Sequence, residues 1–193
     1  AGQVRLSNRA GALLLEVEYE DQMPWPIAAD GAGHSLVLAR PDYGERSVDA
    51  WSPSAHIGGS PGRADPEVED PLDAVVINEF LAHTDFPDVD FIELFNRGSE
   101  TVDLSGCGLS DRADATKFII PAGTQLPPGQ SALFVEAGLG FGLSSQGESI
   151  FLLHADGTRV IDAVRFGPQP AGISSGRSPD GAPATRELSH PTP

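Results

Sequence analysis

The chain has 193 residues, of which 28 are Asp or Glu and 12 are Lys or Arg, so its formal net charge is −16. No basic patch interrupts this charge, which argues against nucleic-acid binding because phosphates would be repelled. The longest apolar runs, 74–77 and 118–120, are far shorter than the roughly 20 residues that span a bilayer, so no membrane insertion is expected.

The first part of the chain is richer in turns than the rest. Strands are expected at 4–6 and 13–19, around a turn at Gly11, with a weaker strand near 35–39. The Gly- and Pro-rich run 58–72 is typical of a linker. Because Ala1 is preceded by neither Met nor a signal-type segment, we expect a processed or excised piece.

Short β-branched and aromatic runs dominate the chain after residue 73. Turn residues, rather than amphipathic helices, separate them, which predicts an all-β sandwich or barrel. Seven runs have the length of strands: 74–80, 91–96, 101–104, 117–120, 131–135, 149–153 and 159–166. We therefore expect a partial β module at 1–57, a linker at 58–72 and a complete β-sandwich at 73–193.

An internal repeat relates the two ends of the chain. Val4-Arg5-Leu6, Gly11 and Val17-Glu18-Tyr19 match Ile150-Phe151-Leu152, Gly157 and Val164-Arg165-Phe166, with one residue of length difference. The N-terminal segment is thus expected to be the back half of the domain whose complete copy follows. Its apolar strand face, Leu13 to Tyr19, then needs a cover, which favours an intermolecular or interdomain contact, including a strand-exchange homo-oligomer.

Five ordered motifs carry a family resemblance. They are Val75-Val76-Ile77-Asn78-Glu79, Asp90-Phe91-Ile92-Glu93-Leu94-Phe95-Asn96, Val102 to Asp111, Ile120-Pro121-Ala122-Gly123-Thr124 and Gly147-Glu148-Ser149-Ile150. This order resembles a bacterial lamin-tail domain over residues 73–193, and 51–62 resembles the closing part of such a domain.

The resemblance implies an all-β, immunoglobulin-like antiparallel β-sandwich. It further implies a non-catalytic interaction or spacer module of a bacterial secreted or cell-surface protein, which recognises a protein or cell-surface partner through loops or strand edges. No cofactor is implied. Two alternatives stay open: a calcium-dependent carbohydrate- or surface-binding module, and an accessory domain of a metal-assisted hydrolase.

Two groups of residues are candidate binding sites. Asp85, Asp88 and Asp90 supply three carboxylates within six residues, the hard oxygen ligands that Ca²⁺ prefers, although the remaining EF-hand positions are missing. A solvated hairpin loop is the simpler interpretation. Trp25, Tyr43 and Trp51 are candidates for stacking on a glycan or a partner, with a role as core side chains as the alternative.

Two catalytic patterns are weaker. Gly172-Ile173-Ser174-Ser175-Gly176 matches a nucleophile elbow, with Asp180 and His190 as nominal partners, but the Pro- and Gly-rich sequence that follows cannot form the required helix. We expect a flexible, turn-rich connection there. Glu79 and Glu93 are spaced as an acid/base pair, yet edge or cross-strand polar positions are the simpler interpretation. Buried, reduced Cys107 is expected to behave as a small hydrophobe.

Overall fold

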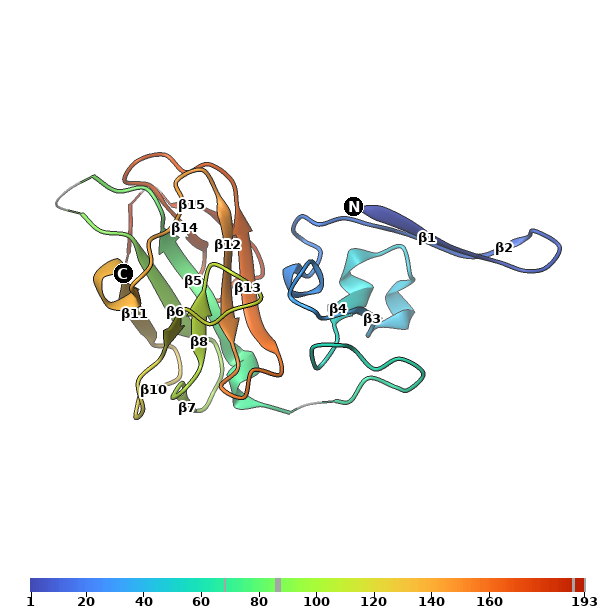
Figure 1. Cartoon of the computed structure of the whole chain (residues 1–193), viewed down its shortest axis with the longest axis horizontal. Helices are drawn as coiled ribbons and strands as arrows, with labels where there is room; N and C mark the ends of the chain where they lie inside the picture. The colour runs from blue at the N-terminus through green and yellow to red at the C-terminus, as the bar shows by residue number, and fades with distance from the viewer. Residues whose placement is uncertain (68, 86–87, 189, 193) are drawn as a thin grey trace. The chain divides into compact units, whose positions relative to one another are not determined.

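The computed structural model describes residues 1–67, 69–85, 88–188 and 190–192 (Figure 1). The chain divides into two compact units, Ala1–Glu67 and Val68–Pro193. The boundaries differ from those expected, because the run 58–72 is shared between the units. Gly58 N donates to Gly33 O at 2.8 Å in the first unit, whereas Pro71–Ala74 already forms a 3₁₀ turn, η4, of the second.

The first unit consists of two antiparallel strand pairs and three 3₁₀ turns. Strands β1 (Gly2–Ser7) and β2 (Leu13–Tyr19) form a two-stranded ribbon, and β3 (Leu36–Leu38) pairs with β4 (Trp51–Pro53). The turns are η1 (Ile27–Ala29), η2 (Pro41–Tyr43) and η3 (Val48–Ala50). The buried apolar residues of this unit are Val17, Ile27, Ala28, Ala32 and Ala50.

The second unit is an antiparallel β-sandwich, as expected. One sheet has the order β11-β6-β5-β14-β15 and the other β13-β12-β8-β9, with β7 and β10 as a separate pair. The bounds are β5 (Val75–Leu81), β6 (Phe91–Asn96), β7 (Val102–Asp103), β8 (Gly108–Ser110), β9 (Phe118–Ile119), β10 (Gln125–Leu126), β11 (Ser131–Val135), β12 (Glu148–Leu153), β13 (Val160–Phe166), β14 (Ser174–Arg177) and β15 (Thr185–Leu188). A single helical turn, α1 (Glu136–Leu139), follows β11 and ends at left-handed Gly140.

The core of the sandwich lies between its two sheets. Alternation along the strands directs one side chain in two inward, so residues from both sheets interdigitate. Phe80 of β5 and Phe166 of β13 join the sheets, with ring centroids 4.5 Å apart. The fully buried members are Ile77, Ile92, Leu94, Leu104, Leu109, Ile150, Leu152 and Val164.

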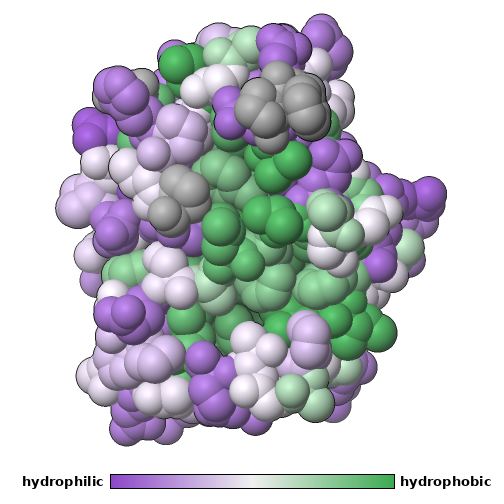
Figure 2. Space-filling model, turned by 90° about the vertical axis from the view of Figure 1, so that its left-hand side faces the viewer, coloured by the Kyte–Doolittle hydropathy of each residue, from purple (hydrophilic) through white to green (hydrophobic). Residues whose placement is uncertain are grey.

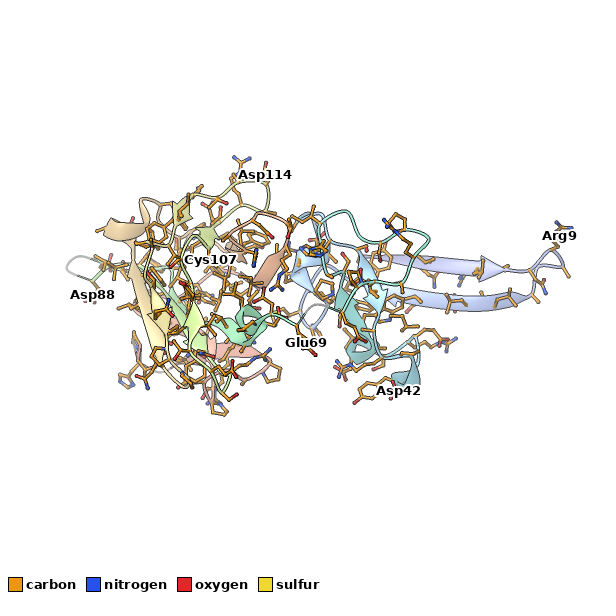
Figure 3. The ribbon with its side chains drawn as sticks, turned by 90° about the horizontal axis from the view of Figure 1, so that it is seen from below. Arg9, Asp42, Glu69, Asp88, Cys107 and Asp114 are labelled. Atoms are coloured by element: carbon orange, nitrogen blue, oxygen red, sulfur yellow. The ribbon has the colours of Figure 1, made fainter. Side chains whose placement is uncertain are left out.

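Cys107 lies within this core and is 1% exposed, which confirms the expectation of a buried thiol (Figure 3). Burial raises the pKa of the Cys107 thiol, against a smaller opposing hydrogen bond from the backbone of Ala155. The protonated thiol therefore packs as a small apolar group beside Leu104 and Leu109.

Strand β14 corrects one sequence expectation. The segment Gly172–Gly176 was expected to be a flexible turn-rich connection, yet Ser174–Arg177 is a strand paired with both β5 and β15. The reason is close approach between backbones: a Cβ at Gly176 would lie 2.8 Å from Asn78 O. Small residues, which favour turns elsewhere, are needed at this crowded position.

Candidate interaction surface

The acidic loop between β5 and β6 separates its three carboxylates. Asp85 and Asp88 are exposed, and Figure 3 shows Asp88 on the loop, away from the sheets. Asp90 is only 8% exposed, because its Oδ1 accepts from Thr84 Oγ1 at 2.9 Å and its Oδ2 from Leu143 N at 3.3 Å. Across the described residues, which omit 86 and 87 of this loop, no group of three or more His, Cys, Asp or Glu is arranged to hold a metal ion.

The carboxylate of Asp90 thus has a structural role that the sequence does not indicate. It ties the start of β6 to the segment after α1, while the Asp90 carbonyl accepts from Glu136 N at 2.9 Å. Calcium binding by Asp85, Asp88 and Asp90 stays a prediction for experiment.

The aromatic residues of the first unit fall into two places. Trp25 and Trp51 pack on each other with ring centroids 6.4 Å apart, and both are half-buried. Trp51 Nε1 donates to Glu45 O at 2.9 Å, which fixes the ring. Tyr43 is 53% exposed, and the guanidinium of Arg40 lies over its ring at 5.0 Å. The tryptophan pair contributes to packing, and the Tyr43 face is the part open to a stacking partner.

Ser174 does not occupy a nucleophile elbow. It begins strand β14 and is fully buried, and its Oγ has no hydrogen-bond partner among the described residues. Its nominal partner Asp180 instead accepts from Asn78 Nδ2 at 3.1 Å. A hydroxyl that no substrate can reach, on a strand without a following helix, lacks the presentation that acyl transfer needs.

Glu79 and Glu93 are cross-strand partners on β5 and β6, directly opposite each other beside a β-bulge. They lie on central strands, not edges, and are 1% and 4% exposed. Glu79 accepts from the backbone and hydroxyl of Thr192, and Glu93 accepts from Asn78 Nδ2 at 2.8 Å. Burial is the main cause that raises the pKa of Glu93. Glu79 therefore fastens the C-terminal segment to the sheet, whereas Glu93 is held by Asn78 of β5, so both residues are cross-strand polar positions.

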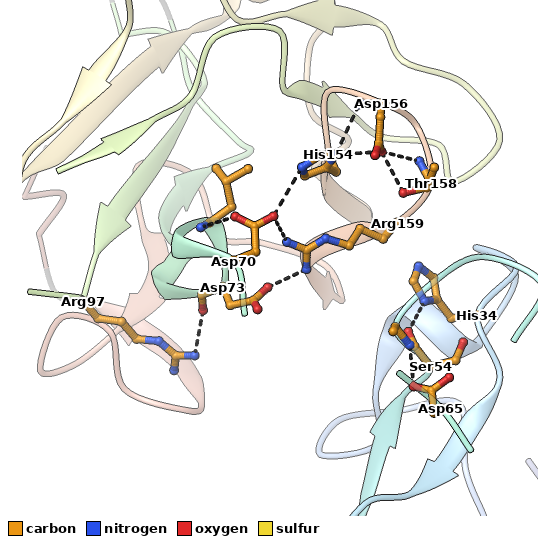
Figure 4. Close-up of polar contacts among 12 residues, drawn as sticks. His34, Ser54, Asp65, Asp70, Asp73, Arg97, His154, Asp156, Thr158 and Arg159 are labelled. Carbon is orange, nitrogen blue, oxygen red and sulfur yellow. Dashed lines mark hydrogen bonds and ion pairs between the residues drawn. The ribbon is translucent and has the colours of Figure 1, made fainter. Parts of the chain in front are cut away.

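An ion-pair cluster joins η4 to the β12–β13 hairpin (Figure 4). Asp70 caps η4 by accepting from Leu72 N at 2.9 Å, and its other oxygen lies 2.6 Å from Arg159 Nη2. Arg159 also pairs with Asp73 and is 8% exposed. Although burial acts in the opposite direction, the hydrogen bonds from Leu72 and Arg159 lower the pKa of Asp70. Partners some 86–89 residues apart leave no local sequence signal.

The second unit exposes apolar side chains on its edge strands. Leu133 and Val135 on β11 are 46% and 36% exposed, and Ile119 on β9 is 66% exposed. Among the residues that the structure describes, each strand ends its sheet, so one row of its backbone groups has no neighbouring strand. Phe118 of β9 and Phe134 of β11 meet edge to face at 5.8 Å, which brings the two edges together. Figure 2, viewed from the side of β11, shows apolar side chains gathered in one broad area. Because Phe118 and Phe134 take the inward positions, Ile119 lies on the outer face of one sheet, and Leu133 and Val135 lie on the outer face of the other. We call Leu133 and Val135, with strand β11, the apolar edge.

Comparison with known families identifies the class to which this sandwich belongs. The family model described as Lamin Tail Domain matches residues 70–168, just over half of the chain. The chain therefore belongs to the lamin-tail family, and the match begins at Asp70, the cap of η4. No curated protein matches the chain. Domains of this family are immunoglobulin-like, generally non-catalytic, and typically act as protein-interaction modules.

Proposed function

We propose that this chain is a non-catalytic interaction and spacer module of a bacterial secreted or cell-surface protein. It recognises a protein or cell-surface partner through loops and strand edges. The observation that carries the proposal is the apolar edge, where exposed Leu133 and Val135 lie on β11, the outermost strand of its sheet among the described residues. Such an edge accepts an added strand, with backbone hydrogen bonds for affinity and apolar pockets for specificity.

Three further observations support the same assignment. The charge of −16 disfavours nucleic acid. Within the described residues, no helix is long and apolar enough to cross a membrane. The two candidate catalytic patterns serve the fold instead, since Ser174 is inaccessible, Glu79 holds the C-terminal segment and Glu93 accepts from Asn78 of β5. Recognition by the surface is therefore the function that the fold favours.

Photo-crosslinking tests this function. A photoreactive residue replaces Leu133 in the chain expressed in a secreting bacterium, and a matched residue replaces exposed Asp114 in the loop between β8 and β9. We expect a discrete adduct from position 133 that is absent from position 114 and that Val135→Asp, on the same face of β11, weakens at least tenfold. Equal adducts at both positions, or none at 133, would overturn the apolar edge as the recognition surface.

A further inference from the structure

The ribbon β1–β2 is built like the hairpin β12–β13. Val4 lies opposite Val17 in the ribbon as Ile150 lies opposite Val164 in the hairpin. Each pairing then shifts register at the corresponding step, after Leu6 in β1 and after Leu152 in β12. Two hairpins with the same turn glycine, register and bulge position are two copies of one structural element.

The two copies differ in what covers them. Ile150 and Leu152 are fully buried, whereas their counterparts Val4 and Leu6 are each 54% exposed. The first residue of the second strand shows the same difference: Val160 of β13 is 6% exposed, and its counterpart Leu13 of β2 is 50% exposed. Val17, the counterpart of Val164, is the exception, because it is only 5% exposed. The ribbon therefore presents as open surface the part of this face that carries Val4, Leu6 and Leu13, whereas the corresponding residues are core in the complete domain.

The complete domain shows what this face contacts. Strand β8 pairs with the outer edge of β12, with Leu109 opposite Leu152, and the inner faces of β12 and β13 pack on the sheet that contains β5. In the ribbon, the edge that corresponds to the β8 contact is Arg5–Ser7. Strand β13 is the last strand of its sheet, so the matching edge of β2 is expected to stay unpaired.

We propose that the apolar face of the ribbon and the outer edge of β1 are the docking site for the front half of a lamin-tail fold from outside these 193 residues. An antiparallel strand equivalent to β8 pairs with Arg5–Ser7, and a sheet equivalent to β5–β6 covers Val4 and Leu6. This inference rests on the proposed function as an interaction module. The partner that it specifies presents an apolar β-sheet face and, beside it, a strand with an unpaired edge.

The second unit of the same chain and a second copy of the chain fit the ribbon less well. The front half in the second unit is already used, because β8 pairs with β12 and β5 pairs with β14. A second copy of the chain brings another ribbon but no unused front half, so it offers Val4 and Leu6 no sheet to pack on. The opposite face of the ribbon is mainly polar, where Gln3 and Arg5 bond with Glu16, and exposed Leu14 lies only at its end beside the turn.

Thiol labelling tests the docking site in the intact chain. Leu6→Cys reports the apolar face, and Gln3→Cys on the same strand is the matched control for the polar face. The probe is residues 70–147 of this chain, made as a separate polypeptide that carries β5–β11. We expect rapid labelling of Leu6→Cys in the monomeric chain, at least tenfold slower labelling with saturating probe, and no change for Gln3→Cys. Buried Cys107 is not expected to react in the native chain, and the unmodified chain provides the background control.

Each other outcome overturns the proposal. Slow labelling in the monomer would mean that the chain covers its own ribbon, and slow labelling only at concentrations where dimers form would assign the face to a second copy. Rapid labelling that the probe leaves unchanged, when circular dichroism shows the probe to be folded, would exclude a front half as the occupant. Because labelling at position 6 is independent of crosslinking at Leu133, failure of the docking site is distinguishable from failure of the apolar edge.

Discussion

Replacing Arg177 by Met is expected to destabilise the sandwich more than any exposed substitution. Arg177 is 6% exposed and connects three strands: Nη2 lies 3.0 Å from Asp162 Oδ2 on β13, and Nε donates to Ile77 O on β5 at 3.0 Å. Nη1 donates to the carbonyl oxygens of Ala182 and Pro183 at 2.6 and 2.9 Å. Met preserves much of the volume but removes every donor.

The magnitude follows from the charge left behind. Breaking a buried ion pair by removing one partner costs about 3–5 kcal/mol, because the remaining charge is desolvated without compensation. For a unit of this size, at roughly 2–4 °C per kcal/mol, the melting temperature should fall by about 6–20 °C. Arg112→Met is the matched control, since Arg112 and its partner Asp114 are 60% and 69% exposed and the melting temperature should hardly change.

The pH dependence distinguishes this explanation from a packing defect. Burial, opposed by Arg177, raises the pKa of Asp162. Without the cation this pKa rises further, so the folded variant binds a proton more readily than the unfolded chain does. Its stability therefore increases as the pH falls from 7.5 towards the unfolded value near 4. Differential scanning calorimetry should show the gap to wild type narrowing from pH 7.5 to pH 5, and Asp162→Asn in the variant should recover part of the loss at pH 7.5. A loss that is the same at both pH values would refute the reasoning.

Three further outcomes are expected. Cys107 should react with a thiol reagent only in denaturant, because burial both shields the thiol and raises its pKa; rapid labelling of the native chain would contradict this. If the acidic loop binds calcium, millimolar Ca²⁺ should raise the melting temperature by calorimetry and Asp88→Asn should abolish the increment, whereas an unchanged curve would mark a solvated loop. Deleting residues 1–67 should leave a folded monomer by circular dichroism and sedimentation; unfolding of the remainder would show that the two units depend on each other.

The sequence was most informative where strands are long and apolar. The runs at 74–80, 91–96, 131–135 and 149–153 coincide with β5, β6, β11 and β12 within a residue or two. Their alternating, β-branched residues satisfy both local propensity and burial, so local and tertiary preferences agree.

The shortest strands could not be predicted from the sequence. Strands β8, β10, β14 and β15 have two to four residues and were not expected as strands. Gly108 in β8 is needed because a Cβ there would lie 2.5 Å from Thr116 Cγ2, yet glycine has no intrinsic preference for strands. Their backbones are extended because neighbouring strands supply hydrogen bonds, which only the folded chain brings together.

The candidate sites were harder still. The three aspartates of the acidic loop share a short stretch of sequence, but Asp90 is drawn inward by Thr84 and by Leu143, 53 residues away. The Arg159 cluster lies between parts of the chain that no local pattern connects. The apolar edge was missed because Leu133 and Val135 look like core residues in sequence, and only the strand order shows that β11 has one neighbour.

Different contacts hold the N-terminal and C-terminal ends of the sandwich. This difference determines which end of a spacer domain would unfold first under tension. Tension entering at Asp70 loads the ion pairs to Arg159, which must separate together because one guanidinium holds both Asp70 and Asp73. Tension entering at the opposite end meets the bonds from Thr192 to Glu79, and then β15, which pairs with β14 alone over four residues. The pairs between β15 and β14 then break one after another, from Leu188 back to Thr185. Under tension, the chain would therefore lengthen first by detachment of its C-terminal segment and β15. This extension would leave the core between the two sheets intact.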